Sequence, residues 1–128
     1  TVLPFQIVEG KEQIVTSDDM PITVSIQLFG DVNHTLAVKG EGKTFGELGK
    51  ALYGMELDAT MLQSFAGEFC NMVLGGIVMS AGTEGIHIDI TTPTMDNVSI
   101  ENAKVYHLDI MNDVKVGSLT VFVTEKEA

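Results

Sequence analysis

The sequence predicts an α+β fold, in which two helices pack on a mainly antiparallel sheet of about six strands. Alternation of apolar and polar residues, which is typical of half-buried strands, marks both ends of the chain. Between them the period changes to that of a helix, and the order of strands, helices and strands favours helices packed on one sheet. The chain has 128 residues, of which 45% are apolar, and no linker or strong repeat. We therefore expect residues 1–128 to form a single domain.

The N-terminal part ends in a hairpin. Residues 22–28 alternate in character, residues 30–33 supply a turn, and alternation resumes at Thr35. Before this hairpin, Glu9 and Gly10 break the pattern into one or two strands. The strands expected here are residues 1–8, 12–15, 22–28 and 35–38.

A short helix is expected next. Thr44 and Glu47 fit a capping box, in which the hydroxyl and the carboxylate each satisfy a free amide at the helix start. Gly54 is suited to end the helix, because a glycine accepts the left-handed conformation at that position.

A second, longer helix is expected from a cap at Asp58 or Thr60 to about Ser80. At about 100° per residue, most of its side chains form a wide apolar face that must lie on the sheet. The residues of this face are Leu62, Phe65, Ala66, Phe69, Cys70, Met72, Val73 and Ile77.

The C-terminal part predicts three more strands. Pro93 ends the first of them, because proline has no N–H to donate to a ladder. Asn112 and Asp113 make the turn of a last hairpin. The strands expected here are residues 86–90, 105–110 and 119–123.

Composition restricts the partners and the compartment. The chain has seven lysines, no arginine and 18 aspartates and glutamates. The resulting formal charge of −11, without a basic cluster, argues against binding to nucleic acid and anionic membranes. The longest nearly uncharged run, residues 72–82, is too short to span a bilayer, and the N-terminus does not resemble a signal peptide. Cys70 cannot form an internal disulfide, so we expect a cytoplasmic protein.

The long helix carries one narrow polar stripe, formed by Ser64, Glu68, Asn71 and Gly75. These four positions fall within roughly 60° of each other around the helix. A solvated outer face would explain a polar stripe, but such a face normally carries several charges, and Glu68 is the only charge in residues 61–79. Gly75 costs about 1 kcal/mol relative to alanine in a helix interior and clears space for another molecule.

The chemistry available to Glu68 and Asn71 is narrow. A carboxylate and an amide, without a nucleophile on the same face, are poorly equipped for covalent catalysis. They can instead complete the active site of a partner. An amide is neutral and both donates and accepts hydrogen bonds, so it can hold a water for attack on phosphorus. A carboxylate can pair with a lysine of the partner.

Two segments resemble the CheC/CheX family of bacterial chemotaxis phosphatases, and its CheX branch in particular. They are residues 64–72, with the sequence Ser-Phe-Ala-Gly-Glu-Phe-Cys-Asn-Met, and residues 88–93, with Ile-Asp-Ile-Thr-Thr-Pro. The family pattern is Asp or Ser, three residues, Glu, two residues, Asn and, some twenty residues later, Pro. Ser64, Glu68, Asn71 and Pro93 match this pattern in order.

The resemblance implies a CheC/CheX-like α/β sandwich that hydrolyses the aspartyl phosphate of a CheY-like receiver domain. It implies that Asn71 positions the attacking water, that Glu68 pairs with a receiver lysine, and that Ser64 and Gly75 contact the partner. Pro93 would shape the strand end. Mg²⁺ would belong to the receiver, with no cofactor held by this chain, and the chain would form a homodimer through sheet edges.

The chain departs from the family in lacking a visible N-terminal helix, and Phe69 and Cys70 replace smaller or aliphatic residues. A non-catalytic module that uses the same helix for dimerisation or partner binding remains an alternative. A ligand or metal site is another alternative if two strands are neighbours. Its residues would be His87, Asp89, His107 and Asp109.

Overall fold

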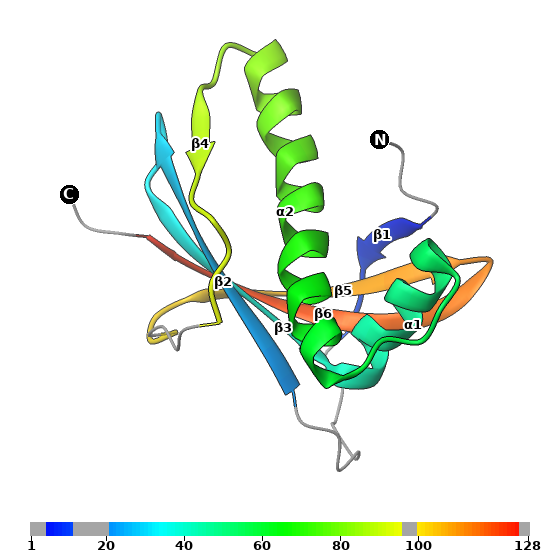
Figure 1. The fold of residues 1–128 in the computed structure, drawn as a ribbon. Helices are drawn as coiled ribbons and strands as arrows, with labels where there is room; N and C mark the ends of the chain where they lie inside the picture. Colours follow the sequence, from blue (N-terminus) through cyan, green and yellow to red (C-terminus); the bar gives the residue numbers. More distant parts are fainter. Residues whose placement is uncertain (1–4, 12–20, 96–99, 126–128) are drawn as a thin grey trace.

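The computed structural model describes residues 5–11, 21–95 and 100–125. This part of the chain forms six strands and two helices (Figure 1). Their bounds are β1 Gln6–Glu9, β2 Pro21–Gly30, β3 His34–Glu41, α1 Gly42–Tyr53, α2 Ala59–Thr83, β4 Ile88–Ile90, β5 Lys104–Asn112 and β6 Val114–Glu125.

The strands form one curled sheet in the order β1-β5-β6-β3-β2-β4, and every neighbouring pair is antiparallel. The predicted α+β architecture is therefore confirmed. The strand expected at residues 12–15 lies outside the described residues. β4 is shorter than predicted, because Ile86 and His87 precede it, and Gly85 turns the chain there with a φ of 81°.

Both helices cover the same face of the sheet. Side chains at alternate positions of the strands point toward them, and the fully buried ones include Val24, Ile26 and Ile110. From the helices, Phe45 and Leu48 of α1 and Phe69 of α2 complete one continuous core. Burial of such large side chains contributes about 1.5–3 kcal/mol each, which is the main force that holds the layers together.

The predicted capping box of α1 is wrong. The N-cap is Glu41, three residues before Thr44; the helix begins at Gly42, and Glu41 makes no side-chain cap hydrogen bond. Thr44 is buried against β6, where a Cβ on Gly117 would lie 2.5 Å from its Cγ2 and 2.6 Å from its Oγ1. Thr44 therefore packs against the sheet instead of capping the helix. The predicted C-terminus is right, since Gly54 has a φ of 71° and donates its N–H to Lys50.

α2 begins where the sequence predicts. Asp58 is the N-cap, and its Oδ1 accepts the N–H of Met61 at 2.9 Å. The first half of the apolar face packs as expected, with Phe65, Phe69 and Cys70 buried. Ile77 was predicted on the buried face but is 51% exposed, and Leu74 is the last buried residue of α2.

Among the described residues, α2 is the one helix long and apolar enough to cross a membrane, with a mean hydropathy of 1.3 over its best window. The sequence analysis counted only the uncharged run that begins at residue 72. The apolar helix is longer than that run, because Glu68 is the only charge in its 25 residues. In the fold, α2 supplies one side of the core, and length and composition alone do not make it a membrane span.

Two glycines should respond to alanine in opposite directions. A Cβ on Gly75 would meet nothing within 4 Å, so Gly75→Ala should raise the free energy of unfolding by up to about 1 kcal/mol through helix propensity. Gly117→Ala would collide with Thr44 and should lower it by about 1–3 kcal/mol. Urea denaturation measures the free energy of unfolding of both variants. If Gly117→Ala did not lower it, the close packing of α1 on β6 would be contradicted.

Candidate active site

A groove of about 600 Å³ runs between α2 and the segment that follows β4. We call it the α2 groove. It brings together four residues that the sequence analysis selected: Ser64, Glu68, Asn71 and Pro93. Among the described residues, its lining is Thr60, Gln63, Ser64, Gly67, Glu68, Asn71, Ile90, Thr91, Thr92, Pro93 and Met95.

The helical wall of the groove presents the carboxylate and the amide. Because Phe65 and Phe69 are fixed in the core, the helical period turns Ser64, Glu68 and Asn71 to the side of the helix that faces β4. Glu68 is exposed and Asn71 is half-buried. Within the described residues, neither side chain forms a hydrogen bond or ion pair with the rest of the chain, so both are available to a partner.

The opposite wall is an irregular continuation of the sheet edge. Ile90 pairs with Leu28 in the regular ladder, and pairing resumes where Thr94 and Ser25 exchange backbone hydrogen bonds of 2.9 and 2.7 Å. Between these pairs β2 contributes two residues and the other strand contributes three, which is the pattern of a β-bulge. Pro93, which has no N–H to donate, lies in this bulge. It comes three residues after β4 ends at Ile90, so Pro93 itself does not end the strand.

A glycine lets the two walls meet. A Cβ on Gly67 would lie 3.6 Å from Pro93 Cβ and 3.7 Å from Met95 Cε. Gly67 is three residues after Ser64 and four before Asn71, so these side chains neighbour it on the helix surface. Pro93 therefore reaches the helix between the serine and the amide, and it closes one side of the groove.

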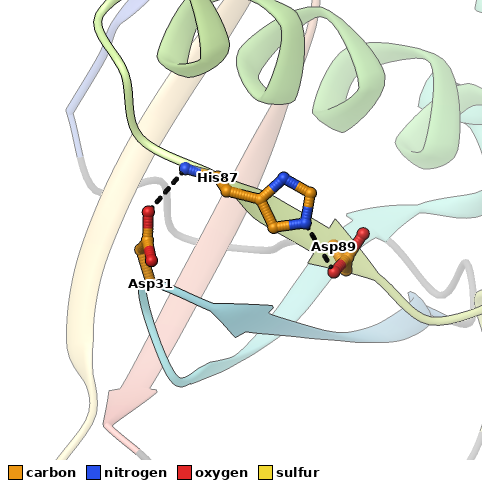
Figure 2. A network of polar contacts seen from close by, with 3 residues as sticks. All are labelled: Asp31, His87 and Asp89. Atoms are coloured by element: carbon orange, nitrogen blue, oxygen red, sulfur yellow. Dashed lines mark hydrogen bonds and ion pairs between the residues drawn. The ribbon is translucent and has the colours of Figure 1, made fainter.

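The other end of β4 is also tied to β2. His87 donates its backbone N–H to Asp31 Oδ2 at 2.8 Å, and Asp31 returns its own N–H to the His87 carbonyl at 2.9 Å (Figure 2). Next to Asp31, Gly30 has a φ of 104°, and a Cβ there would lie 2.8 Å from the His87 carbonyl oxygen. The turn after β2 therefore holds the entry to β4, while the bulge holds its exit.

The histidine and aspartate pairs do not form one site. His87 and Asp89 interact with each other at 3.0 Å beside β2 (Figure 2), whereas His107 and Asp109 lie on β5. β2, β3 and β6 separate β4 from β5, so the proposed grouping of four is wrong. Within residues 5–11, 21–95 and 100–125, no three His, Cys, Asp or Glu side chains are placed to share a metal ion.

Cys70 lies on the core side of α2, as predicted. It is 4% exposed, and burial raises the pKa of its thiol from 9.0 to about 12. Such a thiol stays protonated at neutral pH and does not act as a nucleophile. The groove lining contains hydroxyls but no histidine or lysine to activate them, so its distinctive groups remain the Glu68 carboxylate and the Asn71 amide.

The structure separates Gly75 from the groove and adds residues that the sequence analysis missed. Gly75 lies one turn beyond Asn71, on open surface, and does not line the groove. The residues missed are Thr60, Gln63, Gly67, Ile90, Thr91, Thr92 and Met95. The adjacent threonines before Pro93 were a usable signal, since a threonine hydroxyl can replace a backbone group where a proline interrupts a ladder.

Fold and site together define a class of α+β protein in which one long helix presents a carboxylate and an amide in a groove beside the sheet edge. The sequence model of the family described as chemotaxis phosphatase CheX matches residues 22–110, and the chain belongs to this family. The expected phosphatase class of enzyme agrees with that membership. No curated protein matches the chain by sequence.

Solved structures share the fold at low sequence identity. CheX from Desulfovibrio desulfuricans is 17% identical, with a TM-score of 0.66 over 97% of this chain and 88% of that one. CheX from Vibrio vulnificus is 13% identical, with a TM-score of 0.70 over 98% and 87%. The CheX–CheY–BeF3–Mg²⁺ complex from Borrelia burgdorferi contains a chain that is 18% identical, with a TM-score of 0.58 over 88% and 87%.

Proposed function

We propose that this protein dephosphorylates a CheY-like receiver domain by inserting the Glu68 and Asn71 side chains into the receiver's phosphorylation site. The observation that carries this proposal is that both side chains line one groove and have no partner among the described residues of their own chain. Family membership supports the reaction class. The Borrelia burgdorferi CheX, which was crystallised with CheY, supports the choice of partner.

In the proposed reaction, the Asn71 amide hydrogen-bonds a water and aligns it with phosphorus. The water oxygen attacks as the bond between phosphorus and the aspartyl oxygen breaks, which releases phosphate and restores the receiver carboxylate. A neutral amide suits this position because it orients the water without repelling the charged phosphoryl group. Mg²⁺ would neutralise phosphoryl charge from within the receiver, in keeping with the Mg²⁺ of the homologous CheX–CheY complex.

Glu68 has a different part in the proposal. It is exposed on the same wall and can form a charge-assisted hydrogen bond with a lysine of the receiver. Such a pair would set the register in which Asn71 enters the site. Ser64 would contact the receiver beside it. Receivers act in the cytoplasm, so the proposal places this protein there.

Gly75 has a weaker place in the proposal, because it lies outside the groove. It would contact only a partner that extends along α2 beyond Asn71. Gly75→Ala leaves room at this point, since a Cβ there meets nothing within 4 Å. A loss of receiver affinity in that variant, despite its greater helix propensity, would place the partner over this part of the helix.

Asn71→Ala should lower kcat for release of phosphate from a phosphorylated receiver by about 10²-fold or more, since one positioned group at a developing charge is worth that much. Asn71→Asp, which keeps the size but adds charge, should be equally impaired. Met79→Ala is the matched control, because Met79 is 76% exposed on the same helix and does not line the groove. Binding without any hydrolysis by the wild type would favour the non-catalytic module.

Glu68→Lys should weaken receiver binding by about tenfold or more, because the pair with a lysine becomes a repulsion. Stability should stay within about 0.5 kcal/mol of the wild type, since Glu68 is exposed. Glu84→Lys makes the same change of charge at the end of α2, outside the groove, and serves as the control. Equal weakening by both variants would show that net charge matters and the Glu68 position does not.

We also propose a homodimer joined through a sheet edge. β1 and β4 are the outer strands, and each leaves one side of its backbone unpaired within the described sheet. Sedimentation equilibrium should give twice the mass of the chain at micromolar concentration. A single-chain mass throughout that range would contradict the proposal.

A further inference from the structure

The bulge opposite Glu68 and Asn71 is held by a side chain instead of by the backbone ladder. In a regular antiparallel pair, facing residues can exchange two N–H···O=C bonds. Thr91 donates its N–H to the Gln27 carbonyl at 3.0 Å, but the Gln27 N–H is accepted by the Thr91 hydroxyl, also at 3.0 Å. The hydroxyl of Thr91 therefore occupies the place of its own carbonyl in the ladder.

This substitution keeps the Gln27 N–H hydrogen-bonded at the point where the chain leaves the ladder. Because the Thr91 hydroxyl satisfies Gln27, the Thr91 carbonyl is not required by β2, and the next two residues can bulge outward. The ladder resumes at Thr94, which exchanges two backbone bonds with Ser25. The hydrogen bonds of Thr91 and Thr94 to β2 thus hold Thr92 and Pro93 from both sides, and the bulge has a defined conformation.

The bulge in turn sets the width of the α2 groove. Pro93 lies 3.6 Å from the Cβ position of Gly67, and Met95 lies 3.7 Å from it. Both residues line the groove together with Glu68 and Asn71. A partner that fills the groove to reach the amide would therefore contact this wall, and Thr91 holds the wall to β2.

We propose that Thr91 is a positioning residue that fixes the Thr92–Pro93 bulge as the second receiver-binding wall of the α2 groove. The inference rests on the proposed function. Thr91 acts through the shape of the wall, while Asn71 acts on the water. The two roles therefore predict different kinetic effects. Loss of the Thr91 hydroxyl should change affinity, whereas loss of the Asn71 amide should change the chemical step.

The test compares Thr91→Val, which keeps the branched shape but has no hydroxyl, with Thr91→Ser, which keeps the hydroxyl. We expect Thr91→Val to raise the KM for a phosphorylated CheY-like receiver, and the Kd for the same receiver loaded with beryllofluoride and Mg²⁺, by about three- to tenfold. The kcat should change less than twofold, and Thr91→Ser should restore both constants. Amide exchange at Gln27 should accelerate in the valine variant alone, because its N–H loses its acceptor.

Thr83→Val is the control. It removes a threonine hydroxyl that donates to the Ser80 carbonyl at 2.7 Å, at the end of α2 and outside the groove. It should leave KM, Kd and Gln27 exchange as in the wild type.

The outcomes separate the two proposals. Hydrolysis by the wild type with an unchanged KM in Thr91→Val overturns the inference but leaves the proposed function intact. Faster Gln27 exchange without any change in affinity also overturns it, since the hydroxyl would then be merely structural. Binding that weakens in Thr91→Val, in a wild type that releases no phosphate, supports the wall and overturns the phosphatase activity. A wild type that does not bind the receiver overturns both.

Discussion

The packing of Phe65 and Phe69 into the core is the constraint on which the site depends. These rings are almost fully buried, and no rotation of α2 could expose them without losing several kcal/mol of apolar burial. Once they are fixed, the 100° step of the helix also fixes the direction of the neighbouring side chains on α2. Glu68 and Asn71 must then lie at the flank of the helix, beside β4, where the groove forms.

A fixed helix face does not by itself make a groove, because a groove needs a second wall. That wall comes from the weakest part of the sheet, a three-residue edge strand. Backbone pairing over three residues gives few hydrogen bonds. Side-chain hydrogen bonds therefore supplement it at both ends of β4, from Asp31 before the strand and from Thr91 after it. The edge strand thus keeps a defined position while its bulge departs from the flat ladder and approaches Gly67.

Features that depend on hydrophobic periodicity could be predicted from the sequence, whereas features that depend on contacts between distant segments could not. Alternation placed the strands of both hairpins, and the helical period placed Ser64, Glu68 and Asn71 on one stripe. Thr44 was misread because its pattern fits a cap, whereas its environment is set by Gly117, more than seventy residues away. Ile77 was misread because periodicity tells which side of a helix is apolar but not how far along the helix that side is buried, and in α2 burial ends at Leu74. The threonines before Pro93 were a signal, but the role of Thr91 could not be predicted, since it depends on the register with Gln27.

The charge of the groove fits a phosphorylated partner better than the charge of the chain does. The protein carries −11 overall, which would repel a phosphoryl group at long range. Electrostatic repulsion between exposed charges is screened beyond about 8 Å at physiological ionic strength. Inside that distance the described lining of the groove presents one charge, Glu68, among hydroxyl, amide and apolar groups. A single carboxylate can be neutralised by one lysine, after which the remaining contacts are neutral dipoles. Recognition would then rest on short-range geometry, which is why the placement of both walls matters more than the net charge.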